Sequence, residues 1–263
     1  MNTWIIVAII FILTVLMIMS GRGGGNFYVA ALVLSGVSMH VASTTSQFIL
    51  LASSLMGALV FGKAKAMSCP LVFFFGGINA TSAFFGGFYA HMFGGVTLKI
   101  VLSILLFLAG IVMLFPEKQE HKIAVSHFGF WNIHENDNLY VINLWVAVPL
   151  TIVTGFFSGM VGISGGSFLV PLMVVGCGVP VRIAIGTATT MLAATALTGF
   201  IGNALHGGFN PVLAIPCGIV AIIGGLIGGK IALKTKPKIL RTISGILTII
   251  AAIIMLLSAL QGK

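Results

Sequence analysis

Acidic residues are nearly absent from this chain of 263 residues, which has four Asp and Glu against 13 Lys and Arg. Charged residues of both signs make up only 6% of the chain, whereas a soluble domain carries about 25%. A chain of this size must cover its exterior with polar groups if it folds in water, and these residues are too few to do so. The shortage excludes a soluble enzyme, a disordered regulator and a nucleic-acid reader.

Cysteine is also scarce. Cys69, Cys177 and Cys217 are odd in number and show no CxxC spacing, so neither a disulfide framework nor a zinc site is indicated. No carboxylate pair, His-Glu zinc motif or nucleophile elbow lies in an apolar segment. We therefore expect no enzyme activity, no metal site and no cofactor.

Long apolar runs dominate what is present, since 59% of the residues are hydrophobic. A spanning helix needs about 20 apolar residues. Such runs cover about 2–20, 41–61, 70–88, 96–115, 141–161, 182–203, 211–230 and 241–260, and two shorter runs, about 24–38 and 166–180, each follow a glycine cluster. The first run lacks the basic region and cleavage site of a signal peptide, so we interpret it as a retained span. The sequence predicts an all-α polytopic membrane protein.

The chain repeats itself, which indicates two related halves. A shift of 141 residues places Gly21, Gly24, Gly25 and Phe27 on Gly162, Gly165, Gly166 and Phe168. After one inserted residue, a shift of 142 places Thr45 on Thr187, Gly57 on Gly199 and Gly86-Gly87 on Gly228-Gly229. We predict a first membrane repeat at 1–115, a cytoplasmic connecting loop at 116–140 and a second membrane repeat at 141–263.

The basic residues indicate that the two repeats are inverted, because cytoplasmic loops collect Lys and Arg. Lys63 and Lys65 follow the third run, whereas the equivalent loop near 204–208 has no basic residue. Opposite orientation requires an odd number of crossings in each half, so we predict ten crossings, five in each repeat. That count leaves only Lys99 and Lys263 outside the cytoplasmic side. The alternative is eight crossings with the two short segments re-entrant.

Glycine-interrupted short segments at matching positions of inverted repeats are typical of secondary transporters. The two breaks are GRGGGN and GISGGS, and each precedes a short helix whose N–H groups and positive dipole end can face an anion. We predict substrate-binding residues at the first break (Arg22, Gly23, Gly24, Gly25 and Asn26) and at the second (Ser164, Gly165, Gly166 and Ser167). The glycines of the long runs, by contrast, are interpreted as packing positions.

A polar stretch follows each break, and its hydroxyl and amide groups could replace the water that an anion loses. From these stretches we add Thr45, Gln47 and Thr187 as candidate binding residues, with helix-to-helix bonding as the alternative role. His40 and Arg182 share one repeat position and are also candidates, His40 for proton coupling and Arg182 with a cytoplasmic anchor as the alternative. Asn79 and Asn203 either line the path or bond between helices. His134, Glu135 and Asp137 are interpreted as part of a solvated loop.

The second half is similar to the sulfite exporter TauE/SafE family, in GISGGSFLVPLMVVGCGVPVRIAIGTATT (162–190). The shared features are the glycine cluster, Pro171, the G-V-P turn at 178–180 and the A-x-G-T step at 184–187. The first half departs from this form, because Ala30 replaces the proline. The resemblance implies export of sulfite or small organosulfonates across the cytoplasmic membrane of a prokaryote.

We therefore expect a secondary transporter that moves small sulfur-containing anions by alternating access, with a passive anion channel as the alternative. The expected partners are the anionic substrate and the lipid bilayer, with a proton as a candidate coupling ion and no nucleic acid. A homodimer is compatible with the sequence.

Overall fold

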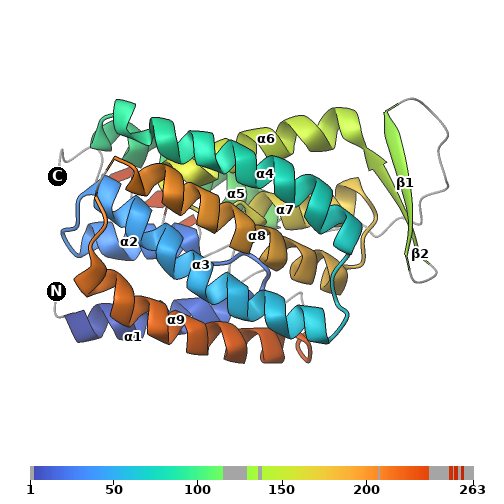
Figure 1. The fold of residues 1–263 in the computed structure, drawn as a ribbon, viewed down its shortest axis with the longest axis horizontal. Coiled ribbons are helices and arrows are strands. Elements are labelled where there is room, and N and C mark those ends of the chain that lie inside the picture. The colour runs from blue at the N-terminus through green and yellow to red at the C-terminus, as the bar shows by residue number, and fades with distance from the viewer. Residues whose placement is uncertain are drawn as a thin grey trace.

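The fold is a bundle of helices whose axes follow the long dimension of the molecule, with a small β-hairpin at one end (Figure 1). The structure is a computed structural model that describes residues 3–114, 129–135, 138–206 and 208–236, with 249–250, 252–253 and 256–257. The first half contains α1 (Thr3–Met19), α2 (Gly25–Leu34), α3 (Met39–Lys63), α4 (Cys69–Tyr89), the 3₁₀ turn η1 (Ala90–Met92) and α5 (Gly95–Leu114). The second half contains α6 (Leu144–Val161), α7 (Gly166–Pro171), the π-helical turn η2 (Leu172–Gly176), α8 (Val181–Ala204) and α9 (Pro211–Ala232).

Local chemistry explains where several of these helices begin. Asn143 caps α6 by accepting a hydrogen bond from the Trp145 backbone N–H at 3.0 Å. Asn210 caps α9 in the same way, accepting from the Leu213 N–H at 3.3 Å. Pro70 and Pro211 lie in the first turns of α4 and α9, where a missing N–H costs little. The two prolines thus mark helix starts at nearly equivalent places in the two halves.

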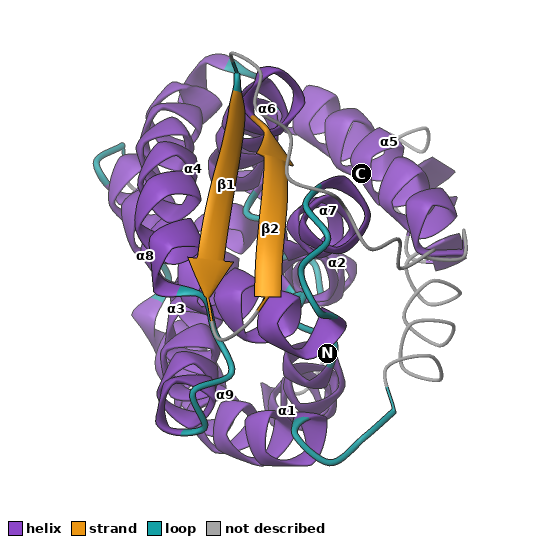
Figure 2. Ribbon diagram, turned by 90° about the vertical axis from the view of Figure 1, so that its right-hand side faces the viewer, coloured by secondary structure: helices purple, strands orange, loops and turns teal. Residues whose placement is uncertain are grey.

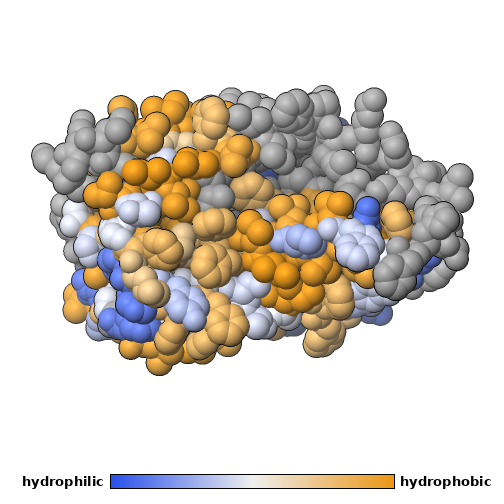
Figure 3. All heavy atoms as spheres, turned by 90° about the horizontal axis from the view of Figure 1, so that it is seen from above, coloured by the Kyte–Doolittle hydropathy of each residue, from blue (hydrophilic) through white to orange (hydrophobic). Residues whose placement is uncertain are grey.

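Five of the described helices are long and apolar enough to cross a membrane. They are α3, α4 together with η1, α6, α8 and α9. Large apolar side chains such as Phe73 (81% exposed) and Val212 (80% exposed) cover the outside, and the surface seen in Figure 3 is largely hydrophobic. Hydroxyl side chains such as Ser46 and Thr187 are instead fully buried. This distribution suits a lipid environment, so the predicted all-α membrane protein is confirmed at that level.

Glycines bring the long helices into backbone contact. A Cβ added at Gly86 of α4 would lie 1.9 Å from the Phe156 carbonyl oxygen of α6, and one added at Gly228 of α9 would lie 2.7 Å from that of Val15 in α1. The predicted packing role of Gly86 and Gly228 is therefore confirmed. Helix α4 packs on α6 and α8, and α9 packs on α1 and α3. The helices of the two halves are thus interleaved.

The central pair, α3 and α8, runs antiparallel. A Cβ at Gly57 would lie 2.7 Å from the Thr189 methyl group, and a Cβ at Gly199 would lie 2.8 Å from the Gln47 amide nitrogen. These two contacts exchange under the 142-residue shift, because Gln47 corresponds to Thr189 and Gly57 to Gly199.

The two short runs form less helix than a crossing needs. Helix α2 has 10 residues, which is about 15 Å at 1.5 Å per residue, or half of a core about 30 Å thick. It folds back on α1, since the Tyr28 hydroxyl donates to Thr14 Oγ1 at 2.8 Å. Helix α7 has 6 residues before the π-helical turn. The described lengths thus support a partial crossing for each short run, and the total count of ten stays a prediction.

The connecting segment contains a hairpin, which the sequence analysis missed. Strands β1 (Phe130–Glu135) and β2 (Asn138–Asn143) pair antiparallel, with Ile133 opposite Tyr140. Both of these side chains are buried, and the hairpin lies across one end of the bundle (Figure 2). The prediction of a loop was therefore wrong for residues 130–135, which form a strand with Ile133 buried. Asp137 lies outside the described residues.

Candidate functional site

Two bends interrupt the helices at the glycine clusters found in the sequence. In the first, between α1 and α2, Gly21, Gly23 and Gly24 have φ values of 71°, 72° and 86°. In the second, between α6 and α7, Gly162 has a φ of 79°. Side chains with a Cβ rarely adopt this left-handed region, so glycine is required there. Gly21 and Gly162 are repeat equivalents and share the conformation.

The two breaks lie in direct contact. The Ser164 backbone N–H donates to Asn26 Oδ1 at 2.9 Å, and the Ser164 hydroxyl donates to the Arg22 carbonyl oxygen. A Cβ at Gly25 would lie 2.9 Å from the Ser164 nitrogen, and one at Gly166 would lie 2.7 Å from the Gly21 carbonyl oxygen. The contact therefore depends on glycine on both sides.

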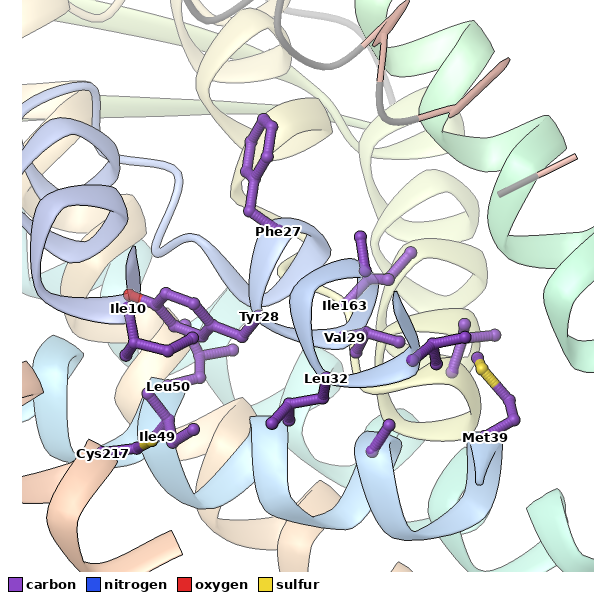
Figure 4. Close-up of a cluster of buried hydrophobic side chains, with 14 of the residues drawn as sticks. Ile10, Phe27, Tyr28, Val29, Leu32, Met39, Ile49, Leu50, Ile163 and Cys217 are labelled. Carbon is purple, nitrogen blue, oxygen red and sulfur yellow. The ribbon is translucent and has the colours of Figure 1, made fainter. Parts of the chain in front are cut away.

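The contact lies at the middle of the central helices. A Cβ at Gly23 would meet Leu50 of α3 at 2.6 Å and Leu192 of α8 at 2.8 Å, and a Cβ at Gly166 would meet Leu192 at 3.0 Å. Leu50 and Leu192 are repeat equivalents near the midpoints of their helices. Apolar side chains also surround α2, among them Ile10 of α1, Ile49 and Leu50 of α3, and Ile163 of the second break (Figure 4).

One positive side chain belongs to this contact. Arg22 is 5% exposed, and its repeat equivalent is Ile163, so the charge is contributed by one half only. An arginine inside a membrane bundle is costly and marks a functional position by default.

Helix α3 supplies polar groups that sequence reasoning only partly identified. Gln47, a predicted residue, is buried and donates through Nε2 to the Ser158 carbonyl oxygen at 2.7 Å. Ser46, which we did not select, lies within 3.1 Å of the Gly25 carbonyl oxygen and 2.9 Å of the Gly162 carbonyl oxygen. Ser46 thus contacts both breaks. Ser46 lies in the polar stretch at 40–47, but its repeat equivalent is the apolar Ala188 and its contacts depend on tertiary packing.

Four predicted residues lie away from the contact, or have roles elsewhere. His40 is half-buried at the start of α3, and Arg182 is exposed at the start of α8, which supports the alternative anchor role for Arg182. The Thr187 hydroxyl accepts a hydrogen bond from the Ser68 N–H at 2.9 Å and so caps the approach to α4. Thr45 is fully buried, and its hydroxyl has no hydrogen-bond partner within the described part of the chain.

Gly165 is the least crowded glycine of the two breaks. A Cβ there would have no neighbour closer than Asn79 Nδ2 at 3.7 Å, and its φ of −66° suits any residue. Asn79 itself donates to Thr195 Oγ1 at 2.8 Å, and Asn203 donates to the Gly159 carbonyl oxygen at 2.7 Å. Both asparagines thus bond between helices, one of the two roles predicted for them. For Ser167 only the backbone is described.

Long apolar helices, buried hydroxyls and a central pair of broken helices define a multi-pass membrane protein of the transporter class. The family description "Sulfite exporter TauE/SafE" matches residues 6–255. The chain belongs to this family, as the sequence analysis predicted, and the prokaryotic cell membrane is its location.

Curated relatives are similar over most of their length. The chain is 25% identical over 244 residues to a probable membrane transporter protein, YunE, of Bacillus subtilis (strain 168), covering 88% of each chain. It is 24% identical to a second one from that organism, YdhB, covering 89% of this chain and 92% of the relative. A probable membrane transporter protein of Xylella fastidiosa (strain Temecula1 / ATCC 700964) is 22% identical, with 88% and 86% covered. No solved structure matches.

Proposed function

We propose that this protein is a secondary transporter that moves small sulfur-containing anions, sulfite or a small organosulfonate, across the cytoplasmic membrane by alternating access. The observation that carries the proposal is the contact between two glycine breaks, one of which holds the buried Arg22. A guanidinium with neighbouring amide and hydroxyl groups can replace the hydration shell of an oxyanion. The family description and the relatives' names support transport.

The substrate is proposed to lie beside Gly165, where an added Cβ would meet its nearest neighbours, Asn79, Leu169 and Thr154, only at ordinary contact distances of 3.7–3.9 Å. Arg22 would supply the charge, and Asn26, Ser164 and Gln47 would shape the polar surface around it. His40, Arg182 and Thr187 are left out of this binding set, because they lie at the helix ends or bond to α4. Ser167 is kept only as a member of the second break.

The architecture proposed for transport is a pair of inverted repeats. Three features support it: the antiparallel α3 and α8, the exchanged contacts of Gly57 and Gly199, and the paired bends at Gly21 and Gly162. Each half then contributes a hairpin with one short arm (α1–α2 or α6–α7) and three further crossings, so the number of passes stays odd. The two short arms cross only in part, as in the re-entrant alternative.

The orientation follows from the basic residues. Lys63 and Lys65 at the end of α3, Arg182 at the start of α8, and Lys230 and Lys234 near the end of α9 are all exposed. The Thr187–Ser68 bond joins the starts of α8 and α4, and α9 runs parallel to α3, so these residues share one end of the bundle. We assign that end, with the β-hairpin, to the cytoplasm. Alternating access would then rock one repeat against the other around the contact between the breaks.

Purified protein in liposomes tests this function. We expect saturable uptake of ³⁵S-sulfite, with competition from a panel of thiosulfate, sulfate, sulfoacetate and taurine that ranks the substrates. Flux that does not saturate and is accompanied by an ohmic current would indicate a passive anion channel instead of a carrier. No flux of any anion in the panel would contradict the proposal.

A further inference from the structure

A cluster of oxygen atoms joins α3 to both breaks. Ser46 Oγ lies 2.9 Å from the Gly162 carbonyl oxygen and 3.1 Å from the Gly25 carbonyl oxygen. A serine hydroxyl has one proton and can donate one full hydrogen bond. With two carbonyl oxygens at this distance, at least one contact lacks a proton of its own. Three electron-rich atoms therefore meet at a fully buried place.

Further polar side chains project from the same face of α3. Ser43, Ser46 and Gln47 are spaced i, i+3 and i+4, so they share one side of the helix. Ser43 Oγ is 3.4 Å from the Met160 carbonyl oxygen. Gln47 Oε1 is buried and has no hydrogen-bond partner among the described residues, while Gln47 Nε2 is fixed by the Ser158 carbonyl oxygen. A buried acceptor without a donor is costly unless a ligand satisfies it.

The C-terminal end of α6 favours a positive ligand. Helix α6 has 18 residues and ends at Val161, so the carbonyl groups of Met160 and Gly162 lie at its negative end. The ligand set is made of carbonyl, amide and hydroxyl oxygens, which suit hard cations. All four acidic residues of the sequence lie between 117 and 137, so no carboxylate belongs to the set. A monovalent cation fits this neutral set better than a divalent one.

The spacing of the oxygen atoms is also compatible with a bound cation. Oxygen ligands that hold a hard cation at about 2.4 Å stand about 3.4 Å apart when adjacent. The contacts of Ser46 with Gly25 and Gly162, at 3.1 and 2.9 Å, need to open by only a few tenths of an ångström. A small shift of the Ser46 side chain is enough for that.

We propose that Ser46 Oγ, the Gly25 and Gly162 carbonyl oxygens and Gln47 Oε1 form a sodium site that couples Na⁺ to anion transport. The inference rests on the proposed function, because the two carbonyl groups belong to the breaks that would hold the anion. Na⁺ at these carbonyl groups and an anion at the same breaks attract each other. Each ligand therefore raises the affinity of the other, and the coupling is reciprocal.

Binding of ²²Na⁺ to the purified protein, with and without sulfite, tests the site directly. We expect displacement by unlabelled Na⁺ but not by K⁺ or choline, and tighter binding when sulfite is present. In liposomes, an inward Na⁺ gradient should raise ³⁵S-sulfite uptake several-fold over an equal choline gradient. No ²²Na⁺ binding, or equal uptake in Na⁺ and choline, would overturn the proposal, and so would uptake driven by a proton gradient alone.

The variant Ser46→Ala removes one ligand, and Ser54→Ala is its matched control. Alanine occupies the equivalent buried position 188 in α8, so this substitution suits the packing. Among the described residues, the Ser54 hydroxyl bonds only within α3, to the carbonyl oxygens of Leu50 and Leu51. Ser46→Ala should raise the Na⁺ concentration for half-maximal uptake by about tenfold or more, with uptake restored at high Na⁺. Ser54→Ala should leave it unchanged. An unchanged Na⁺ response in folded Ser46→Ala would refute the site.

The result for wild-type protein separates the two proposals. If sulfite uptake by the wild-type protein does not depend on Na⁺, the sodium site is refuted and the proposal of an anion transporter stands. Absence of uptake for every anion contradicts the transporter, whereas ²²Na⁺ binding to the same sample still decides whether the cation site exists. If Ser46→Ala fails to fold, the ²²Na⁺ displacement on wild-type protein decides alone.

Discussion

The Ser164 backbone N–H donates to Asn26 Oδ1 at 2.9 Å, across 138 residues of sequence. This bond joins the bend of the second half to the first residues of α2. Both partners are buried, Asn26 at 3% and Ser164 at 1% exposed. Substitutions at this bond can therefore separate the structural role of the contact between the breaks from its proposed role in anion binding.

Asn26→Asp should keep the bond to the Ser164 N–H and weaken anion binding. The carboxylate can still accept the Ser164 N–H, but its negative charge opposes an anion held near Arg22. Asn26→Ala instead leaves a buried N–H without its acceptor, which costs about 1–3 kcal/mol of stability. Melting temperature in detergent and sulfite uptake together distinguish the variants. Full uptake in Asn26→Asp would argue against an anion at this place.

Replacing Arg22 tests the charge of the site. Arg22→Gln should lower the affinity for sulfite by about 30-fold or more, because a desolvated charge partner is lost. Arg182→Gln is the matched control, since Arg182 is exposed at the end of α8 and should leave the affinity unchanged. The dependence of uptake on sulfite concentration gives the affinity of each variant. Equal losses in the two variants would indicate a general effect of net charge rather than a site.

The packing glycines predict a stability effect without a specific effect on anion binding. In Gly86→Ala the new Cβ would lie 1.9 Å from the Phe156 carbonyl oxygen, and overpacking of this kind costs about 1–3 kcal/mol or more. In Gly77→Ala nothing lies within 4 Å, so this variant should melt like the wild type. Thermal melts of the two variants in one detergent check the difference. Similar melting temperatures would contradict the close contact of α4 and α6.

The sequence repeat predicted much of the geometry at the breaks. The 141-residue shift paired Gly21 with Gly162, and both glycines adopt the left-handed conformation; the 142-residue shift paired Gly36 with Gly178, with φ values of 91° and 73°. Such positions are visible in sequence because only glycine satisfies the backbone there at no steric cost. Repeat arithmetic also matched Gly57 with Gly199, whose contacts exchange across α3 and α8.

Other parts could not be predicted in this way, because they depend on tertiary contacts of one half only. Thr45 and Thr187 match in sequence, yet the Thr187 hydroxyl meets the Ser68 N–H and the Thr45 hydroxyl has no hydrogen-bond partner in the described chain. Ser46 has no polar counterpart, and its contacts with the Gly25 and Gly162 carbonyl oxygens depend on α3 packing against both breaks. The hairpin at 130–143 is too short to stand out by alternation, and burial of Ile133 and Tyr140 decides its position.

The most direct test of an anion site at the breaks is sulfite binding to Gly165→Leu, compared with Gly77→Leu. Leucine at 165 fits the backbone, whose φ is −66°, but extends toward Asn79, Leu169 and Thr154, whereas leucine at 77 has no neighbouring atom within 4 Å of its Cβ. With both proteins inserted and folded, the account predicts that Gly165→Leu loses sulfite binding and uptake while Gly77→Leu retains them. Wild-type affinity in Gly165→Leu would contradict it.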